Sequence, residues 1–312
     1  FFGLFVRKVD VVVGTSPQFF TVISAWVLAK FKRVPFVFEL RDIWPASITA
    51  VGAMRGSWII KILEKLELFL YCQADLIISV THSFKLELQN RGVSADKIKV
   101  VLNGVDLSKY RPLAEKDKEF SEKFQLQGKF VAGYVGTHGL AHALDSIIEA
   151  AELLKGENNI RIVFVGGGAD RSRLERMVET RCLYNVVMIP RQPKENMQKI
   201  WSLCDVSLVS LKDTPIFSTV IPSKIFESMA MKIPIIISVP EGEASEIVIT
   251  EKAGLIVPPE NSNKLAGAIL KIKNDIELHS NLAVNSGLAA SKFNRKILAL
   301  DMLNHIEELM CP

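Results

Sequence analysis

"STVIPSKIFESMAMKIPIIIS", residues 218–238, joins a short amphipathic stretch to a run of isoleucines. At 100° per residue, the first part predicts a helix over about 223–231 with an apolar arc and a polar side. The arc holds Ile225, Phe226, Met229 and Ala230, and the polar side holds Lys224, Glu227, Ser228 and Met231. The isoleucine run predicts a buried strand over 233–238, and a helix that leads into such a strand is the repeating unit of parallel α/β folds.

Lys224 and Glu227 on this helix leave two interpretations open. The first is a solvent-facing ion pair, which stabilises a helix by about 0.2–0.5 kcal/mol. The second is the wall of a binding site, because open parallel sheets bind ligands beside the carboxyl ends of their strands.

Strand-length apolar runs alternate with amphipathic helical stretches along the whole chain, as in parallel α/β units. The predicted strands are 9–13, 36–40, 76–80, 98–101, 130–135, 160–165, 186–189, 206–209, 233–238 and 254–257. The predicted helices are 19–31, 58–71, 83–90, 143–154, 171–179, 194–203, 223–231 and 264–273, with helical structure over 281–309. We therefore predict two Rossmann-like, doubly wound parallel-sheet domains, of which the second is complete.

A polar segment over 103–129 predicts the linker between these domains. We expect a partial N-terminal domain over 1–112, a C-terminal domain over 113–290 and a final helix over 291–312 that packs back on the first domain. The first domain has about four predicted strands and begins inside an apolar segment. We expect the rest of it to lie upstream of this sequence.

The composition is that of a globular protein, with 49% hydrophobic and 23% charged residues. Four cysteines without CxxC spacing predict thiols in a reducing compartment, not a disulfide framework or a zinc site. No apolar run approaches the roughly 18 residues that span a bilayer. Residues 1–112 carry 15 Lys and Arg against 9 Asp and Glu. This excess suits an anionic membrane surface or a phosphorylated ligand, but it is too small and too scattered to indicate nucleic-acid binding.

"GTHGLAH", residues 136–142, follows the predicted strand 130–135. Gly136 and Gly139 flank Thr137 and His138, and small residues at a strand end let backbone N–H groups approach a phosphate. His138 and His142 have the i,i+4 spacing of a metal site, but the Glu of HExxH and a third ligand are missing. A ligand-facing His138, a metal site and a structural pair remain as alternatives.

Several common motifs are missing from the sequence. "GGGAD", residues 166–170, departs from GxGxxG because Arg171 replaces the third glycine, and it predicts a tight turn. The chain has no GxxxxGK[ST] loop, no Asp-Xaa-Asp pair for a metal-bound nucleotide diphosphate and no GxSxG elbow.

"FELRDIWP", residues 38–45, places Glu39, Arg41 and Asp42 at the end of a buried strand. Charges at such a position are costly unless they are paired or functional, so an ion pair of Arg41 with Asp42 or Glu39 competes with a site. The apolar helix over 57–71 is either core or a membrane-facing ridge with Lys61 and Lys65 on its polar side, and core is the simpler prediction.

The order of segments resembles that of GT-B glycosyltransferases of the retaining family 4. "VDVVVGTSPQ", "VPFVFELRDIWP" and "KIKVVLNGVDLSKYRP" are similar to the N-terminal domain of that family. "FVAGYVGTHGLAHALDSIIEAA", "IRIVFVGGGADRSRLE" and "PSKIFESMAMKIPIIISV" are similar to its donor-binding domain. The RDIWP and GTHGLAH variants resemble the bacterial O-antigen and capsule subgroup that includes L-fucosaminyltransferases. The resemblance covers essentially the whole chain and implies a GT-B fold, two Rossmann-like domains facing a cleft.

The resemblance also implies roles for single residues. Glu227 matches the second Glu of the family's Glu-x7-Glu motif, which binds the ribose hydroxyls, whereas Thr219 replaces the first Glu. The Arg and Lys that hold the diphosphate are absent from "THGLAHA", and Lys224, His138 and the N–H groups before Ser223 are the available substitutes. The implied catalytic residues are Arg41, Asp42 and His138. The implied donor-binding residues are Gly136, Thr137, Gln192, Phe217, Thr219, Ser223, Lys224, Glu227, Gly242 and Glu243.

The implied activity is retaining transfer of a sugar, an N-acetylated amino sugar, from a UDP-sugar to a polyprenyl-diphosphate-linked glycan in surface-polysaccharide assembly. It implies no metal and no cofactor, with the UDP-sugar as substrate, and a cytoplasmic location on the inner membrane face. Two alternatives remain. A UDP-sugar 2-epimerase shares the GT-B architecture, and a non-catalytic donor-binding half would need a partner.

Overall fold

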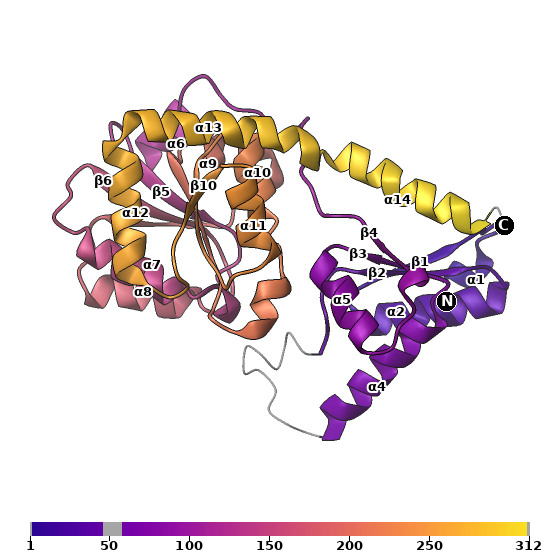
Figure 1. The fold of residues 1–312 in the computed structure, drawn as a ribbon. Helices are drawn as coiled ribbons and strands as arrows, with labels where there is room; N and C mark the ends of the chain where they lie inside the picture. Colours follow the sequence, from indigo (N-terminus) through magenta and orange to yellow (C-terminus); the bar gives the residue numbers. More distant parts are fainter. Residues whose placement is uncertain (1, 46–57, 311–312) are drawn as a thin grey trace. The chain divides into compact units, whose positions relative to one another are not determined.

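A computed structural model describes residues 2–45 and 58–310, which form two compact units (Figure 1). Unit 1 comprises 1–103 with 296–312, and unit 2 comprises 104–295. The division follows residue 103, whereas the sequence places it after residue 112. The intervening segment hydrogen bonds within unit 2: Gln198 Nε2 donates to Arg111 O at 2.8 Å.

Unit 1 is built on a four-stranded parallel sheet in the order β1-β2-β3-β4. Its strands are β1 (Val12–Thr15), β2 (Phe36–Leu40), β3 (Leu76–Ser79) and β4 (Ile98–Val100). Its helices are α1 (Phe2–Phe5), α2 (Phe19–Lys32), α4 (Trp58–Gln73), α5 (His82–Asn90) and the 3-10 turn η1 (Ala95–Lys97). Because the strands follow one another in chain order, right-handed connections place α2, α4 and α5 on one face of the sheet (Figure 1).

The other face of the unit 1 sheet is covered by the last helix, α14 (Arg295–Met310). Ile306 lies in one apolar cluster with Val37 and Ile78 of the sheet. The helical segment predicted over 281–309 is divided into α13 (Ile276–Ala290) and α14, with the turn η5 (Ser291–Phe293) between them. The helix is interrupted because Asn294 is extended and forms a parallel bridge with Val105.

Unit 2 is a complete doubly wound domain with the strand order β10-β9-β8-β5-β6-β7, all parallel. Its strands are β5 (Phe130–Val135), β6 (Ile160–Gly166), β7 (Val186–Pro190), β8 (Val206–Ser210), β9 (Ile235–Ser238) and β10 (Gly254–Ile256). Its helices are α6 (Lys118–Lys123), α7 (Leu144–Leu153), α8 (Arg171–Thr180), α9 (Met197–Ser202), α10 (Lys224–Ala230), α11 (Glu243–Thr250), α12 (Ser262–Asn274) and α13. Short 3-10 turns are η2 (Leu140–His142), η3 (Lys194–Asn196) and η4 (Pro215–Thr219). The predicted α/β fold class is thus confirmed.

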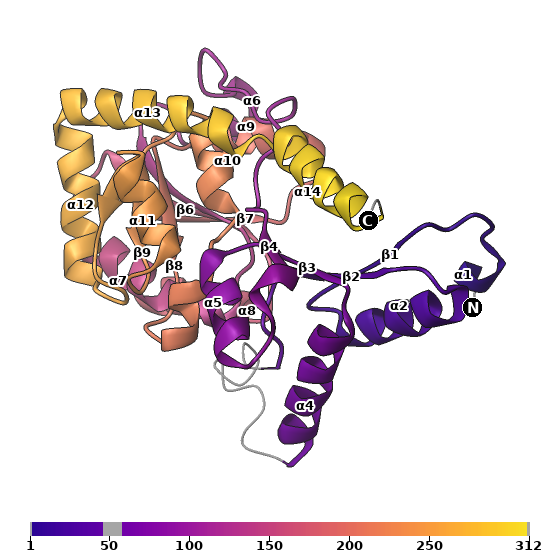
Figure 2. The same ribbon diagram turned by 45° about the vertical axis from the view of Figure 1, so that its right-hand side comes forward.

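Side chains of the central strand β5 alternate between two cores. Ala132 and Tyr134 face a cluster formed with α7, α8 and α12, whereas Val131 and Val135 face one formed with α9. Figure 2 shows α12 and α13 along the outside of this unit.

The strand order reverses between β5 and β8, which are neighbours in the sheet although β6 and β7 separate them in the chain. Ligands of open α/β sheets bind at such a reversal, beside the carboxyl ends of the strands. The loops that leave the two strands are hydrogen bonded to each other: Lys212 N donates to Ala141 O at 2.9 Å, and Ser210 Oγ donates to His142 O at 2.6 Å.

Helix α10 is buried on nearly all sides, so the predicted polar side is wrong. Lys224, Ser228 and Met231 are buried, and Glu227 is half-buried. The helix packs between β8 and α13, and its predicted polar side faces the sheet, because Lys224 lies against Tyr134 of β5 and Ser228 contacts Ser207 of β8. Ser228 is accommodated because its hydroxyl bonds Ser207 Oγ at 2.7 Å.

Helix α4 differs from the prediction in the opposite direction. Trp58, Ile62 and Phe69 are 72%, 50% and 42% exposed, so the core interpretation is wrong for this part of the helix. Its buried side includes Glu67, whose carboxylate accepts a hydrogen bond from Tyr71 Oη at 2.5 Å. It also accepts one at 3.2 Å from the guanidinium of Arg91, the residue that follows α5. Among the described residues, no helix is long and apolar enough to cross a membrane.

Gly133 in β5 generates a testable prediction, since a Cβ there would overlap the buried Cys204 Sγ. We expect Gly133→Ala to destabilise unit 2 by about 1–3 kcal/mol, because overpacking forces side chains off their rotamers. Gly267→Ala is the matched control: its Cβ meets nothing within 4 Å, and we expect no loss of stability. Denaturant midpoints measure both changes. Gly133→Ala should cost less in a Cys204→Ala background, and an equal cost would contradict the overlap.

Candidate active site

The loop after β5 is held by its own backbone. The N–H of Gly136 donates to Val165 O at 2.9 Å, and the N–H of His138 donates to Gly167 O at 2.9 Å. The sequence predicts that amides of this loop approach a phosphate, but these two amides already donate to carbonyl groups of the protein. The amide of Thr137 has no hydrogen-bond acceptor within the described part of the chain.

The glycines of "GGGAD" allow the loop after β6 to approach the loop after β5. Gly166 and Gly168 have φ values of 146° and 154°, and a Cβ on either would overlap the carbonyl oxygen of Gly136 or His138. The glycines thus serve contact between two loops, in addition to the turn that the sequence predicts.

Two histidines surround the ring of Tyr134 at the end of β5. The centroids of the His138 and His142 rings both lie 6.0 Å from that of Tyr134. Among the described residues, neither nitrogen of the fully buried His138 nor Nδ1 of His142 has a hydrogen-bond partner. Burial, with the nearby charge of Lys224, lowers the pKa of both to about 4, so both imidazoles are neutral at pH 7. No group of three or more His, Cys, Asp or Glu among the described residues could hold a metal ion.

Lys224 completes this cluster from α10. Its Nζ lies 3.5 Å from the centroid of the Tyr134 ring and has no hydrogen-bond partner in the part of the chain that the structure describes. Burial lowers the pKa of this amine to about 7, against the opposing effect of the Glu227 carboxylate. A Cβ on Gly136 would lie 3.1 Å from Nζ, so the amine lies directly beneath the loop after β5.

Glu227 lies one turn further along α10 and is well supplied with donors. Trp201 Nε1 donates to Glu227 Oε2 at 3.2 Å, and the Tyr110 hydroxyl acts on the same carboxylate, lowering its pKa. Burial raises the pKa of Glu227, whereas the Trp201 hydrogen bond and the charges of Lys224 and Arg295 lower it. The ion pair that one interpretation of the sequence proposes is therefore not the arrangement: the Glu227 carboxylate is bonded to aromatic donors, and the Lys224 amine is unpaired.

The turn η4, which follows β8, and the start of α11, which follows β9, contact each other. Phe217 is buried, and Thr219 Oγ1 donates to Ile216 O at 2.7 Å. A Cβ on Gly242 would overlap Ser218 O, so the residue before α11 must be glycine for these segments to meet.

The remaining predicted donor-binding residues occupy the ends of elements. Ser223 is exposed before α10, and Glu243 is the half-buried first residue of α11. Gln192 follows β7, where its amide donates to Pro190 O at 3.0 Å.

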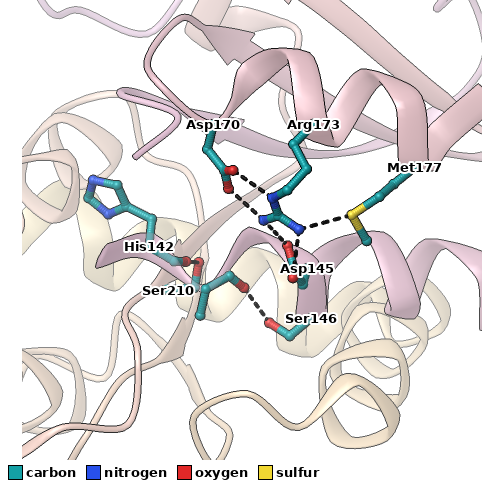
Figure 3. Close-up of polar contacts among 8 residues, drawn as sticks. His142, Asp145, Ser146, Asp170, Arg173, Met177 and Ser210 are labelled. Carbon is teal, nitrogen blue, oxygen red and sulfur yellow. Dashed lines mark hydrogen bonds and ion pairs between the residues drawn. The ribbon is translucent and has the colours of Figure 1, made fainter. Parts of the chain in front are cut away.

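A charged network stabilises the loop after β6 (Figure 3). Arg173 donates to Asp145 at 2.5 and 3.0 Å and to both carboxylate oxygens of Asp170 at 2.6 Å. The Asp170 amide in turn donates to His138 O at 3.0 Å. Figure 3 also shows the Ser210 hydroxyl directed at the His142 carbonyl. This network fixes the loop that carries His138.

In unit 1, the predicted catalytic residues are positioned by the loop after β1. The buried Ser16 Oγ accepts from the backbone amides of Arg41 at 2.9 Å and Asp42 at 3.2 Å. Arg41 is exposed, and Asp42 is half-buried. The carboxylate of Glu39 accepts from Thr15 Oγ1 at 2.6 Å, which satisfies one of the charges that the sequence leaves open.

Sequence reasoning missed Trp201 and Tyr110. Trp201 lies in a stretch that predicts an ordinary helix, and Tyr110 lies in the predicted linker. The available signal is chemical: a buried indole or phenol carries a donor that needs a partner, and Glu227 is the predicted site residue that can accept.

Sequence comparisons place the chain among sugar transferases. Residues 115–287 match the family Glycosyl transferases group 1, and residues 3–109 match Glycosyltransferase Family 4. The probable glycosyltransferase WbjE of Pseudomonas aeruginosa is 25% identical over 271 residues, which are 85% of this chain and 66% of that protein. The colanic acid biosynthesis glycosyl transferase WcaI of Escherichia coli, itself a putative assignment, is 25% identical over 72% of this chain and 56% of its own length. The chain therefore spans about half to two thirds of these relatives.

Solved structures show the same fold. HepE of Anabaena in complex with UDP-glucose is 17% identical and superposes with a TM-score of 0.81 over 96% of this chain and 79% of that one. The sucrose-phosphate synthase of Thermosynechococcus elongatus is 21% identical, with a TM-score of 0.78 over 97% and 74%. These neighbours are GT-B glycosyltransferases, and both units have the parallel α/β sheets of that fold. Because its group 1 match covers more than half of its length, this chain belongs to the glycosyl transferases group 1.

Proposed function

We propose that this chain transfers a sugar from a UDP-sugar to a lipid-linked glycan during surface-polysaccharide synthesis, with retention at the anomeric carbon. The observation that carries the proposal is the placement of Lys224 and Glu227 on α10 at the strand-order reversal of unit 2. Lys224 Nζ lies beneath Gly136, where a diphosphate would rest, and Glu227 is one turn away, where a ribose would rest.

The chemistry requires a group that stabilises the departing diphosphate. The bond between the sugar carbon and the UDP β-phosphate oxygen breaks, a bond from that carbon to the acceptor oxygen forms, and the acceptor hydroxyl proton passes to an oxygen of the departing diphosphate. A cation near the developing phosphate charge lowers this barrier. We assign this role to Lys224, with His138 and the free Thr137 amide nearby, and we propose that no metal takes part.

The choice of donor rests on resemblance and comparison together. HepE binds UDP-glucose, and the O-antigen subgroup that the sequence resembles uses N-acetylated amino sugars. We therefore propose a UDP-linked N-acetylated amino sugar as the donor. WcaI is named for colanic acid, a surface polysaccharide, which supports a polyprenyl-diphosphate-linked acceptor at the inner face of the membrane.

The exposed side of α4 supports peripheral contact with that membrane. At 100° per residue, Trp58, Ile62 and Phe69 point within about 40° of one another, and Lys61 and Lys65 flank them. An apolar stripe beside lysines suits the interface of an anionic bilayer. This favours the membrane-facing interpretation of the helix.

The activity itself is tested by incubating the chain with UDP-N-acetylglucosamine and related UDP-sugars plus a polyprenyl-diphosphate-linked acceptor. We expect retained-configuration product in equal yield with and without EDTA. Loss of activity in EDTA would contradict the metal-free part. Epimerised UDP-sugar without transfer would favour the 2-epimerase, and UDP-sugar binding without either reaction would favour the donor-binding half.

Lys224 generates a prediction about pH. Its pKa of about 7 means that UDP binding above pH 7 must be accompanied by protonation of the amine, so affinity should fall as pH rises. We expect Kd for UDP to rise up to about tenfold per pH unit between pH 7.5 and 9, where the phosphates no longer titrate. Lys224→Met should bind UDP weakly and lose this slope. Lys264→Met, on the exposed side of α12, is the matched control and should keep it; calorimetry measures all three.

The α4 stripe generates a prediction about membranes. Ile62→Ser and Phe69→Ser should each weaken co-sedimentation with anionic phospholipid vesicles by about 5- to 10-fold, because each removes one buried apolar side chain. Leu288→Ser is the control, since Leu288 is also exposed, at 68%, but lies on α13. Equal loss with Leu288→Ser, or equal binding to neutral vesicles, would contradict a specific role of α4.

A further inference from the structure

The carboxylate of Glu227, on α10, has aromatic neighbours instead of a salt bridge. Trp201, which donates its indole N–H at 3.2 Å, is fully buried. Tyr110, whose hydroxyl acts on the same carboxylate, is half-buried. Two uncharged aromatic side chains therefore act on one carboxylate that is itself half-buried.

We propose that Trp201 and Tyr110 are positioning residues that orient the Glu227 carboxylate to accept hydrogen bonds from the ribose hydroxyls of the donor. This inference rests on the proposed function, because it assumes that Glu227 contacts a ribose.

The physical reason is the acceptor capacity of a carboxylate. An ionised carboxylate has about four lone-pair sites, so two inward donors leave others for a diol, whereas a protonated carboxyl has a donor in place of an acceptor. Burial raises the pKa of Glu227, and the hydrogen bonds from Trp201 and Tyr110 counteract that effect. Lys224 and Arg295 are the charged groups that act in the same direction. Aromatic donors add orientation without adding a competing salt bridge.

The fold fixes both donors relative to α10. Trp201 belongs to α9, and Gln198 of the same helix donates to Arg111 O at 2.8 Å, the residue next to Tyr110. Tyr110 lies in a segment that begins near Val105. The N–H of Val105 donates to Phe293 O at 2.9 Å and fixes the start of that segment.

Phe293 also contacts α10 through its side chain. The rings of Phe293 and Phe226 are 4.7 Å apart, and Phe226 precedes Glu227. Trp201, Tyr110 and Glu227 thus belong to segments that are tied to one another by backbone hydrogen bonds and ring contacts.

The competing explanation is that Trp201 only fills the core. Trp201→Phe keeps most of the ring volume and removes the N–H, and Tyr110→Phe removes the O–H at the margin of the core. The two variants give independent tests if one of them folds poorly. Trp26→Phe and Tyr184→Phe are matched controls: the Trp26 indole N–H has no partner among the described residues, and the Tyr184 hydroxyl bonds Lys155 O.

The test measures Kd for UDP by calorimetry from pH 5.5 to 8.5, in wild-type and Glu227→Gln backgrounds. We expect Trp201→Phe to weaken binding several-fold, and by a larger factor at pH 5.5 than at pH 8.5, because loss of the donor raises the pKa of the carboxyl. Tyr110→Phe should act in the same direction. In the Glu227→Gln background, which cannot titrate, both changes should have little further effect.

Each outcome decides a different point. A loss that is equal at every pH, or that adds in full to that of Glu227→Gln, would show that the aromatic residues act through packing and would overturn the positioning role. No UDP binding by the wild-type chain at any pH would overturn the proposed function and this inference with it. Wild-type binding that Glu227→Gln leaves unchanged would refute the positioning role while leaving UDP as a ligand.

Discussion

The burial of the Lys224 amine against the face of Tyr134 is the constraint on which the unit 2 site depends. An ammonium in that position loses its hydration, and a ring face 3.5 Å away returns only part of that cost, on the order of 2 kcal/mol. The amine is therefore poised between its charged and neutral forms, and an arriving anion stabilises the charged form. Gly136 must lack a side chain for the loop to lie this close to Nζ. The sheet reversal, the loop and the helix meet at this one contact.

The two ionisable side chains of α10, Lys224 and Glu227, differ in whether they have a hydrogen-bond partner within the described residues. Glu227 accepts a hydrogen bond from Trp201, whereas Lys224 Nζ donates to no acceptor among the described residues. A carboxylate with satisfied inward oxygens is rigid and specific for a diol, because its geometry is fixed before the ligand arrives. An unpaired amine is less specific but responds strongly to charge. In the proposed site, Glu227 thus recognises the ribose by geometry, and Lys224 recognises the diphosphate by charge.

The sequence predicts the fold better than the site, for a physical reason. Strands such as 36–40 and 130–135 are buried on both faces, and their continuous apolar runs therefore predict them correctly. The polar side of α10 was predicted wrongly because a helical wheel does not include the strands that Lys224 and Ser228 contact, β5 and β8. The exposed ridge of α4 was predicted to be core because apolar residues alone do not reveal which side meets the sheet. Loop amides such as that of Gly136 look available in the sequence because their acceptors belong to other loops.

The arginines nearest to the site strengthen the case that Lys224 carries the electrostatic part. Arg171 donates to Gly166 O at 2.6 Å, to Ile189 O at 2.9 Å and to Glu175 at 2.7 Å. Arg173 is held between two carboxylates. Moving either guanidinium to a diphosphate would break several charge-assisted or buried hydrogen bonds, each of which contributes roughly 1–3 kcal/mol. Lys224 would break none, so an anion at this loop gains the most from the amine that the fold leaves without a partner.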